Sequence, residues 1–252
     1  MLTIALSHPC SETIAYDTGF TKWYAEERDI LFQRVYYSLQ TESLRGYIMP
    51  KLSSEIENNI LKKMTASHNL GFFFKGKTNN CLFYRIGGGR YWKIFTSFSP
   101  EFILNDIPST SSRENHLYFD SPELRDCAIA VLSSSLFFWY FIISTNCRDL
   151  NPSDLKEFNI DILSFKTEVS CVLVNLSQKL MEDYKRNSII KEKISSLTGK
   201  IKYQEFYPRL SKPIIDKIDE QLARHYGFTE EELDFIINYD INYRMGDKLS
   251  EE

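Results

Sequence analysis

Five basic side chains and no acidic one fall within residues 71–100 of this 252-residue chain, whose formal net charge is −4. Aromatic side chains are interleaved with these cations. Lysine and arginine bind phosphates or guanine edges, and aromatic rings offer stacking area, so the window predicts a nucleic-acid-binding surface. The alternative is a solvated hairpin whose aromatic rings face the core. The basic residues are Lys75, Lys77, Arg85, Arg90 and Lys93, and the aromatic residues among them are Tyr84, Tyr91 and Trp92.

The element that must position these side chains is a β-hairpin. Two runs of apolar and aromatic residues, Cys81 to Ile86 and Tyr91 to Phe95, flank three consecutive glycines. Glycine supplies the positive φ angles of a tight reversal, so the glycines predict the hairpin tip. A phosphate or S-adenosylmethionine loop would instead lie between a strand and a helix. Leu70 to Phe74 is predicted to add a third strand, and Lys75 and Lys77 then lie in a polar turn, as phosphate contacts or as solvated residues.

Residue types that could catalyse a reaction lack the spacing that such chemistry needs. The four histidines are isolated and have no metal-ligand spacing, so no metal site is predicted. No Ser/His/Asp or Cys/His pattern has a supporting local motif, so we predict no catalytic residue in this chain. The five cysteines include no Cys-x-x-Cys pair, which favours reduced thiols and a cytoplasmic location.

Five segments resemble, in the same order, parts of a known family, and they are spread over most of the chain, from residue 47 to residue 240. Residues 84–95 resemble the hairpin in the C-terminal specificity region of N6-adenine DNA methyltransferases of the Type IIG restriction–modification kind. The other similar segments are residues 47–57, which lead into an early helix; 132–140, a helix rich in serine, leucine and aromatic residues; 146–151, the loop after that helix; and 226–240, the C-terminal tail.

The resemblance implies a DNA target-recognition domain, as a specificity subunit or fragment that directs a separate catalytic subunit to double-stranded DNA. The catalytic half of that family would carry an Asn-Pro-Pro-Tyr or Asp-Pro-Pro-Tyr motif, but no two prolines are adjacent in this chain. We therefore expect no cofactor on this chain, and S-adenosylmethionine on the catalytic partner. Two alternatives stay open. In the first, the chain is part of a split site-specific DNA-methyltransferase (adenine-specific) that is active only in complex. In the second, it is a protein-interaction module derived from such a domain.

The charge pattern and the resemblance together predict the DNA contacts. Arg148 lies in a loop between two predicted helices, where it either contacts DNA or pairs with Asp149. The hairpin and its neighbouring turn supply the other candidates. The predicted DNA-binding residues are Lys75, Lys77, Arg85, Arg90, Tyr91, Trp92, Lys93 and Arg148.

We predict an α+β fold in two parts. Residues 1–164 are expected to form a mixed α/β target-recognition domain with a β-meander and a buried helix, and residues 165–252 a helical docking or dimerisation region. Residues 165–197 are predicted to be one long helix, because apolar residues recur near a heptad spacing without proline or glycine. Its second half carries Ile190 and Ile194 without obvious cover, so we expect this helix to dock the partner or to form a homodimer.

Capping residues and apolar runs predict the remaining elements. Ser121 and Pro122 begin a helix that is expected to run to about Ile143. Residues 127–147 are uncharged and numerous enough to cross a bilayer, but their serines and the lack of a flanking basic cluster favour a buried core helix, so no membrane is expected. The other predicted elements are strands at residues 2–6, 13–16 and 160–163, a loop at 105–117, and helices at 54–64, from 151, at 213–226 and at 230–239.

Overall fold

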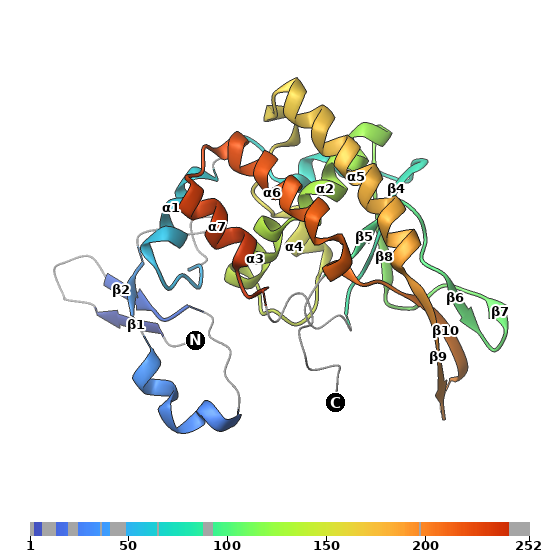
Figure 1. The fold of residues 1–252 in the computed structure, drawn as a ribbon, viewed down its shortest axis with the longest axis horizontal. Coiled ribbons are helices and arrows are strands. Elements are labelled where there is room, and N and C mark those ends of the chain that lie inside the picture. Colours follow the sequence, from blue (N-terminus) through green and yellow to red (C-terminus); the bar gives the residue numbers. More distant parts are fainter. Residues whose placement is uncertain are drawn as a thin grey trace.

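The computed structural model describes residues 3–6, 14–19, 25–35, 37–40, 49–64, 66–87, 93–196 and 198–241. Within these ranges, helices are combined with small antiparallel sheets, which confirms the predicted α+β class. Figure 1 shows a mainly helical body with the amino-terminal sheet at one end and another sheet extending from the opposite end. A third sheet lies against the helices of the body.

The amino-terminal sheet contains the first two predicted strands. They pair antiparallel, with Thr3 opposite Asp17 and Leu6 opposite Ile14, which confirms both. A 3-10 helix, η1, separates them from the third strand of this sheet. The elements are β1 (Thr3–Leu6), β2 (Ile14–Asp17), η1 (Ala25–Arg34) and β3 (Ser38–Leu39).

The predicted hairpin strands belong to a three-stranded sheet with the order β5-β4-β8. Their antiparallel pairing is confirmed, since Phe83 lies opposite Thr96 and Tyr84 lies opposite Phe95. The tip, residues 88–92, lies outside the described residues. The three strands are β4 (Asn80–Arg85), β5 (Phe95–Thr96) and β8 (Glu114–Phe119).

The prediction of a third strand at Leu70 to Phe74 is wrong. Residues Leu70–Phe73 form a short 3-10 helix, η2, in which Leu70 and Phe73 are both buried on one side. The third strand is β8, which pairs with β4 over six residues. It begins inside the stretch 105–117 predicted as a loop, so that prediction is wrong over residues 114–117. Leu117 and Phe119 alternate with polar neighbours in β8 and are buried, as expected for a strand with one face on the core.

The single helix predicted from Pro122 to about Ile143 is two helices that meet at a bend of 67°. The Ser134 side chain causes the break, because its Oγ accepts a hydrogen bond from Phe137 N at 3.0 Å and so caps the second helix. Among the described helices, none alone is long and apolar enough to span a bilayer. The two helices are α2 (Pro122–Leu132) and α3 (Ser135–Ser144), and the apolar side chains of α3 are buried.

Two shorter helices begin where their capping residues predict. Ser54 caps α1 (Glu55–Lys63) by accepting a hydrogen bond from Glu57 N at 3.4 Å, and Asn151 caps α4 (Pro152–Lys156). The strand predicted at residues 160–163 is wrong. A 3-10 turn, η3 (Ile162–Ser164), forms instead, because the Asp161 carboxylate accepts a hydrogen bond from Leu163 N at 3.0 Å.

The long helix predicted over residues 165–197 is also wrong in its second half. Helix α5 spans Thr167–Asn187, and the backbone turns extended at Ser188. The residues that follow form an antiparallel hairpin, β9 (Ile189–Ser195) and β10 (Gly199–Glu205). Isoleucine has a higher propensity for strands than for helices, and β10 finds a further pairing partner elsewhere in the chain.

That partner is β6, so a four-stranded sheet forms with the order β7-β6-β10-β9. None of its residues is buried on either face, and Figure 1 shows it extending away from the helical body. Ile190 and Ile194, predicted on a helix, therefore lie on the edge strand β9. The two remaining strands are β6 (Phe102–Leu104) and β7 (Ile107–Pro108).

The core joins the two predicted parts of the chain. Helix α5 packs against α2 and against α6 (Lys212–Tyr226), with Leu173, Leu180, Ile218 and Leu222 buried between them, as their spacing predicts. One buried cluster contains residues from both sides of residue 164. The separate roles predicted for the two parts, DNA recognition for residues 1–164 and docking for residues 165–252, stay predictions. The last elements are η4 (Pro208–Ser211) and α7 (Glu230–Asn238), which begins at the predicted capping box of Thr229.

Candidate nucleic-acid interface

Three segments converge where β4 ends and the glycine-rich tip begins. Ile86 N donates a hydrogen bond to Arg113 O at 2.9 Å, and Leu150 N donates one to Ile86 O at 2.8 Å. The first bond ties the hairpin to the turn before β8, and the second ties it to the loop after α3. The base of the hairpin is therefore fixed from both sides by backbone hydrogen bonds.

Gly87 is the point of closest approach between these segments. It is buried, and a β-carbon there would lie 2.6 Å from Asp149 Oδ1 and 2.7 Å from Arg113 Nη1. Glycine permits the close approach of these two charged side chains, whose ends would have to move aside for a larger residue. The Asp149 carboxylate faces the hairpin and forms no ion pair with Arg148 in the described structure.

The loop after α3 is held by a lysine from a distant part of the chain. Lys51 Nζ donates hydrogen bonds to Thr145 O and, at 3.4 Å, to Cys147 Sγ. Cys147 has a positive φ of 61°, and Asn146 Oδ1 accepts a hydrogen bond from Arg148 N at 3.0 Å. These contacts fix the loop backbone, while the Arg148 side chain is exposed. A fixed backbone with an exposed guanidinium suits a phosphate or base contact.

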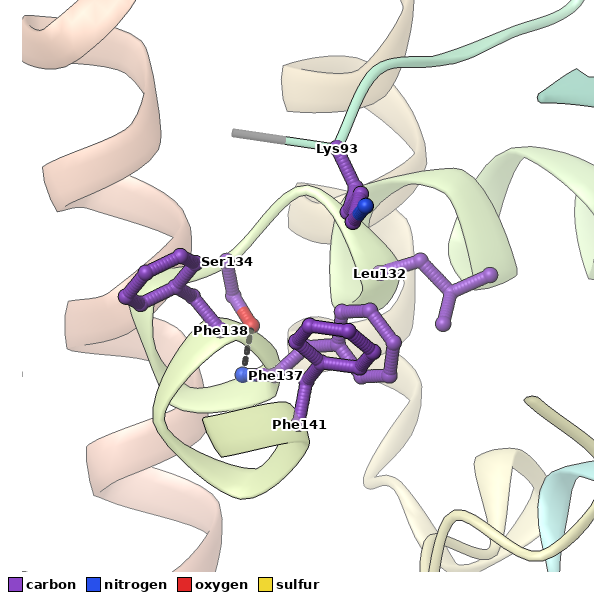
Figure 2. A pocket seen from close by; sticks show the side chains of 6 residues that line it. All are labelled: Lys93, Leu132, Ser134, Phe137, Phe138 and Phe141. Carbon is purple, nitrogen blue, oxygen red and sulfur yellow. Dashed lines mark hydrogen bonds between the residues drawn. The ribbon is translucent and has the colours of Figure 1, made fainter. Parts of the chain in front are cut away.

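Lys93 lies on the other side of the hairpin base and is half-buried. Its Nζ is 5.3 Å from the centre of the Phe141 ring, which is a cation–π contact. Figure 2 shows Lys93 over a small hollow that is lined by Leu132, Ser134, Phe137, Phe138 and Phe141. Burial lowers the pKa of Lys93, and the negative charges of Asp149, Cys147 and Asp154 oppose that shift. The lysine therefore contributes less to an external phosphate-binding surface than its sequence position suggests.

The predicted DNA-binding residues fall into two groups. Arg85 and Arg148 are exposed near the tip end of β4, with Lys93 beside them. Lys75 and Lys77 are exposed near the opposite end, and Lys75 Nζ lies 3.1 Å from Asp120 Oδ2. Lys75 pairs with Tyr118, which lies opposite Cys81 of β4. At about 3.4 Å per residue, the four steps from Cys81 to Arg85 separate the two groups by roughly 14 Å. The other three candidates, Arg90, Tyr91 and Trp92, lie outside the described residues.

Tyr84 is a core residue and not a stacking residue. Its side chain is only 3% exposed, and burial, together with the charge of Asp154, raises its pKa to about 12. The alternation of β4 explains this placement, because Leu82 and Tyr84 share the face that packs on the helices. The alternative given from the sequence, that the aromatic rings of the hairpin face the core, is therefore correct for Tyr84.

Sequence reasoning missed Arg113 at this site. Arg113 is exposed, its side chain borders Gly87, and its carbonyl holds the hairpin. The signal was available, because Arg113 directly precedes the alternating segment of β8. Recognising that segment as a partner of β4 would have placed Arg113 beside the end of the hairpin strand.

Comparisons with protein-family models, curated proteins and solved structures found no match for this chain. Within the described ranges, no group of three or more histidine, cysteine, aspartate or glutamate side chains could hold a metal ion. The functional interpretation is therefore built on the chain's own residues and their geometry.

Proposed function

We propose that this chain is the sequence-specific DNA-binding module of an N6-adenine DNA methyltransferase of the Type IIG restriction–modification kind, acting in the cytoplasm. The observation that supports DNA binding is the convergence of the backbone segments of Arg85, Arg113 and Arg148 near the buried Gly87 at the base of a glycine-rich hairpin. The proposed family rests on the resemblance of residues 84–95 and the four other segments. Backbone hydrogen bonds fix the three segments that carry these arginines and leave the three exposed guanidinium groups available to a ligand. Arginine binds guanine edges and phosphates with fixed geometry, as duplex recognition requires.

The proposed division of labour follows from this arrangement. The hairpin and the loop after α3 read base edges in the major groove, and Lys75 and Lys77 bind phosphates further along the duplex. A separate subunit carries S-adenosylmethionine and the catalytic residues. The chain alone therefore binds DNA and transfers no methyl group.

The experiment compares duplex binding by wild type and by the double variant Arg113→Ala with Arg148→Ala, across a range of salt concentrations. Each lost phosphate contact reduces the magnitude of the slope of log K against log salt by about 1, so the slope decreases by about 2 if both contact phosphates. Arg224→Ala, an exposed arginine on α6, is the matched control and leaves the slope unchanged. A folded double variant with the wild-type affinity and slope would remove this site from the interface.

We further propose that β9 docks the catalytic subunit. Ile190 is 49% exposed and Ile194 is 79% exposed, and both point to the same face of the edge strand. Edge strands with exposed apolar residues pair readily with another chain. Ile190→Glu with Ile194→Glu should abolish binding to the catalytic subunit without changing DNA affinity. If the variant instead loses a homodimer seen by mass in solution, the strand is a self-association surface.

A further inference from the structure

The outer face of the β5-β4-β8 sheet carries a row of aromatic side chains. The register places Phe83 of β4 opposite His116 of β8, and Cys81 opposite Tyr118. Side chains that are directly opposite in an antiparallel pair share one face of the sheet. Their neighbours Leu82, Tyr84, Leu117 and Phe119 face the helices and are buried. On β5 the second face is also covered, because Thr96 opposite Phe83 is buried, so its accessible part lies on β4 and β8.

The three rings on this face form a continuous strip. The ring centres of Phe83 and His116 are 6.3 Å apart, and those of His116 and Tyr118 are 5.1 Å apart. His116 is exposed, and Phe83 and Tyr118 are half-buried. We call these three side chains the aromatic strip. Their positions are fixed by the strands that carry them, and part of the ring surface is accessible to solvent.

Basic side chains lie at both ends of the aromatic strip. Lys75 forms an isolated β-bridge with Tyr118, so its side chain lies on the same face, with Lys77 close by in the chain. Arg85 lies at the other end, opposite Glu114. Lys77 and Arg85 have no ion pair within the described structure, and their charges are available to an anion. The Glu114 carboxylate accepts a hydrogen bond from Ser99 Oγ at 3.3 Å and forms no ion pair with Arg85 in the part of the chain that the structure describes.

We propose that the aromatic strip and its flanking cations bind single-stranded DNA. Bases stack on Phe83, His116 and Tyr118, and the backbone phosphates bind Lys77 and Arg85. The bases of a duplex are stacked on each other and cannot reach rings set in a flat sheet, whereas unpaired bases can. Three rings with centres 5.1 Å and 6.3 Å apart offer stacking surface to about three unpaired bases, one on each ring. This site shares Arg85 and Lys77 with the proposed duplex site, but its three rings, Arg113 and Arg148 each belong to one of the two sites alone, so each site can be tested by itself.

The test measures fluorescence anisotropy of a labelled 12-nucleotide oligothymidine, with a 12-base-pair duplex and a 12-nucleotide oligouridine measured in parallel. Phe83→Leu and Tyr118→Leu should each weaken oligothymidine binding by about 5- to 150-fold, the range for the loss of one stacking platform. Tyr118→Phe retains the ring and should bind as wild type does. Phe72→Leu removes an exposed ring elsewhere, 57% exposed on η2, and is the matched control.

Duplex binding and oligothymidine binding are both measured for the arginine variants and for the aromatic variants, so that the two sites are tested separately. Arg113→Ala with Arg148→Ala should weaken duplex binding and leave oligothymidine binding unchanged, so failure of either site is seen separately. The proposal is overturned if wild type does not bind oligothymidine, or if folded Phe83→Leu and Tyr118→Leu proteins bind it as wild type does. Equal losses of duplex and single-strand binding in these variants would make the face part of the duplex site. Tighter binding to oligouridine would assign the strip to RNA.

Discussion

Substitution of Glu57, whose carboxylate is buried, tests how the chain positions the loop that carries Arg148, which we propose contacts DNA. Glu57 in α1 is 2% exposed, and its Oε1 accepts a hydrogen bond at 3.1 Å from Nε1 of Trp139, which is fully buried in α3. Its Oε2 accepts from Ser53 N at 2.7 Å and from Ser53 Oγ at 2.8 Å. One side chain therefore joins the start of α1 to the helix that leads into the Arg148 loop.

Glu57→Ala should lower the free energy of unfolding by about 2–4 kcal/mol. Leaving the indole N–H of Trp139 without an acceptor costs about 1–3 kcal/mol. Removing the charged acceptor of the Ser53 donors lowers the free energy of unfolding by a similar amount. Relief of the carboxylate's own desolvation offsets part of this sum. Glu57→Gln keeps an oxygen for Trp139 and should lose only about 1–2 kcal/mol.

Urea denaturation followed by far-ultraviolet circular dichroism measures these changes. Glu55→Ala, an exposed glutamate on the same first turn, is the control and should change stability by no more than about 0.5 kcal/mol. A double-mutant cycle with Trp139→Phe should give a coupling of about 0.5–3 kcal/mol. A loss below about 1 kcal/mol in Glu57→Ala, or a coupling near zero, would refute the argument that this hydrogen bond holds α3 to α1.

Two further predictions concern the hairpin base and the response to pH. Gly87→Ala should weaken duplex binding with little loss of stability, because the new β-carbon meets the movable ends of Asp149 and Arg113 and not backbone; a fall in melting temperature without a change in DNA affinity would contradict this. Burial lowers the pKa of His225, against the opposing charge of Asp161, so the unfolded chain binds the proton more readily than the folded one. The stability tied to His225 is therefore full above about pH 6.5 and falls as the pH drops below it, and His225→Gln should reduce the loss of melting temperature between pH 7.5 and pH 5.5.

Local signals in the sequence predicted the helix starts well. Ser54, Ser121, Asn151 and Thr229 all cap the helices that their positions predict, because a capping hydrogen bond involves only residues three or four apart. Two predictions failed because strands pair with distant segments: the second half of the long helix and the loop that contains β8. The strand predicted at residues 160–163 failed for a local reason, the hydrogen bond from Leu163 N to Asp161. The cap at Ser134 was missed although it is a local hydrogen bond. Its serine lies within a long uncharged, mostly apolar run, which the sequence pattern predicted as one continuous helix.

The placement of the candidate site was less predictable than its composition. Sequence alone identified Arg85 and Arg148 as candidates, but it could not show that β8 pairs with β4 and brings Arg113 between them. The sequence also predicted Lys93 as a DNA contact and placed Tyr84 among the aromatic residues of a nucleic-acid-binding surface. The tertiary structure buries Tyr84 against the helices and half-buries Lys93 against Phe141.

By itself, the sequence determined the α+β class, the helix boundaries set by capping residues, the heptad-like stripe that packs α5 on α6, and the cationic composition of the hairpin region. These properties depend on side-chain periodicity and on hydrogen bonds within one or two turns of chain. Only the tertiary structure decided that residues 189–205 form a hairpin, since β10 gains a partner in β6, about 100 residues earlier. A strand's free energy depends on such distant pairing, and therefore the same isoleucines that fit a helical stripe lie on an exposed edge strand.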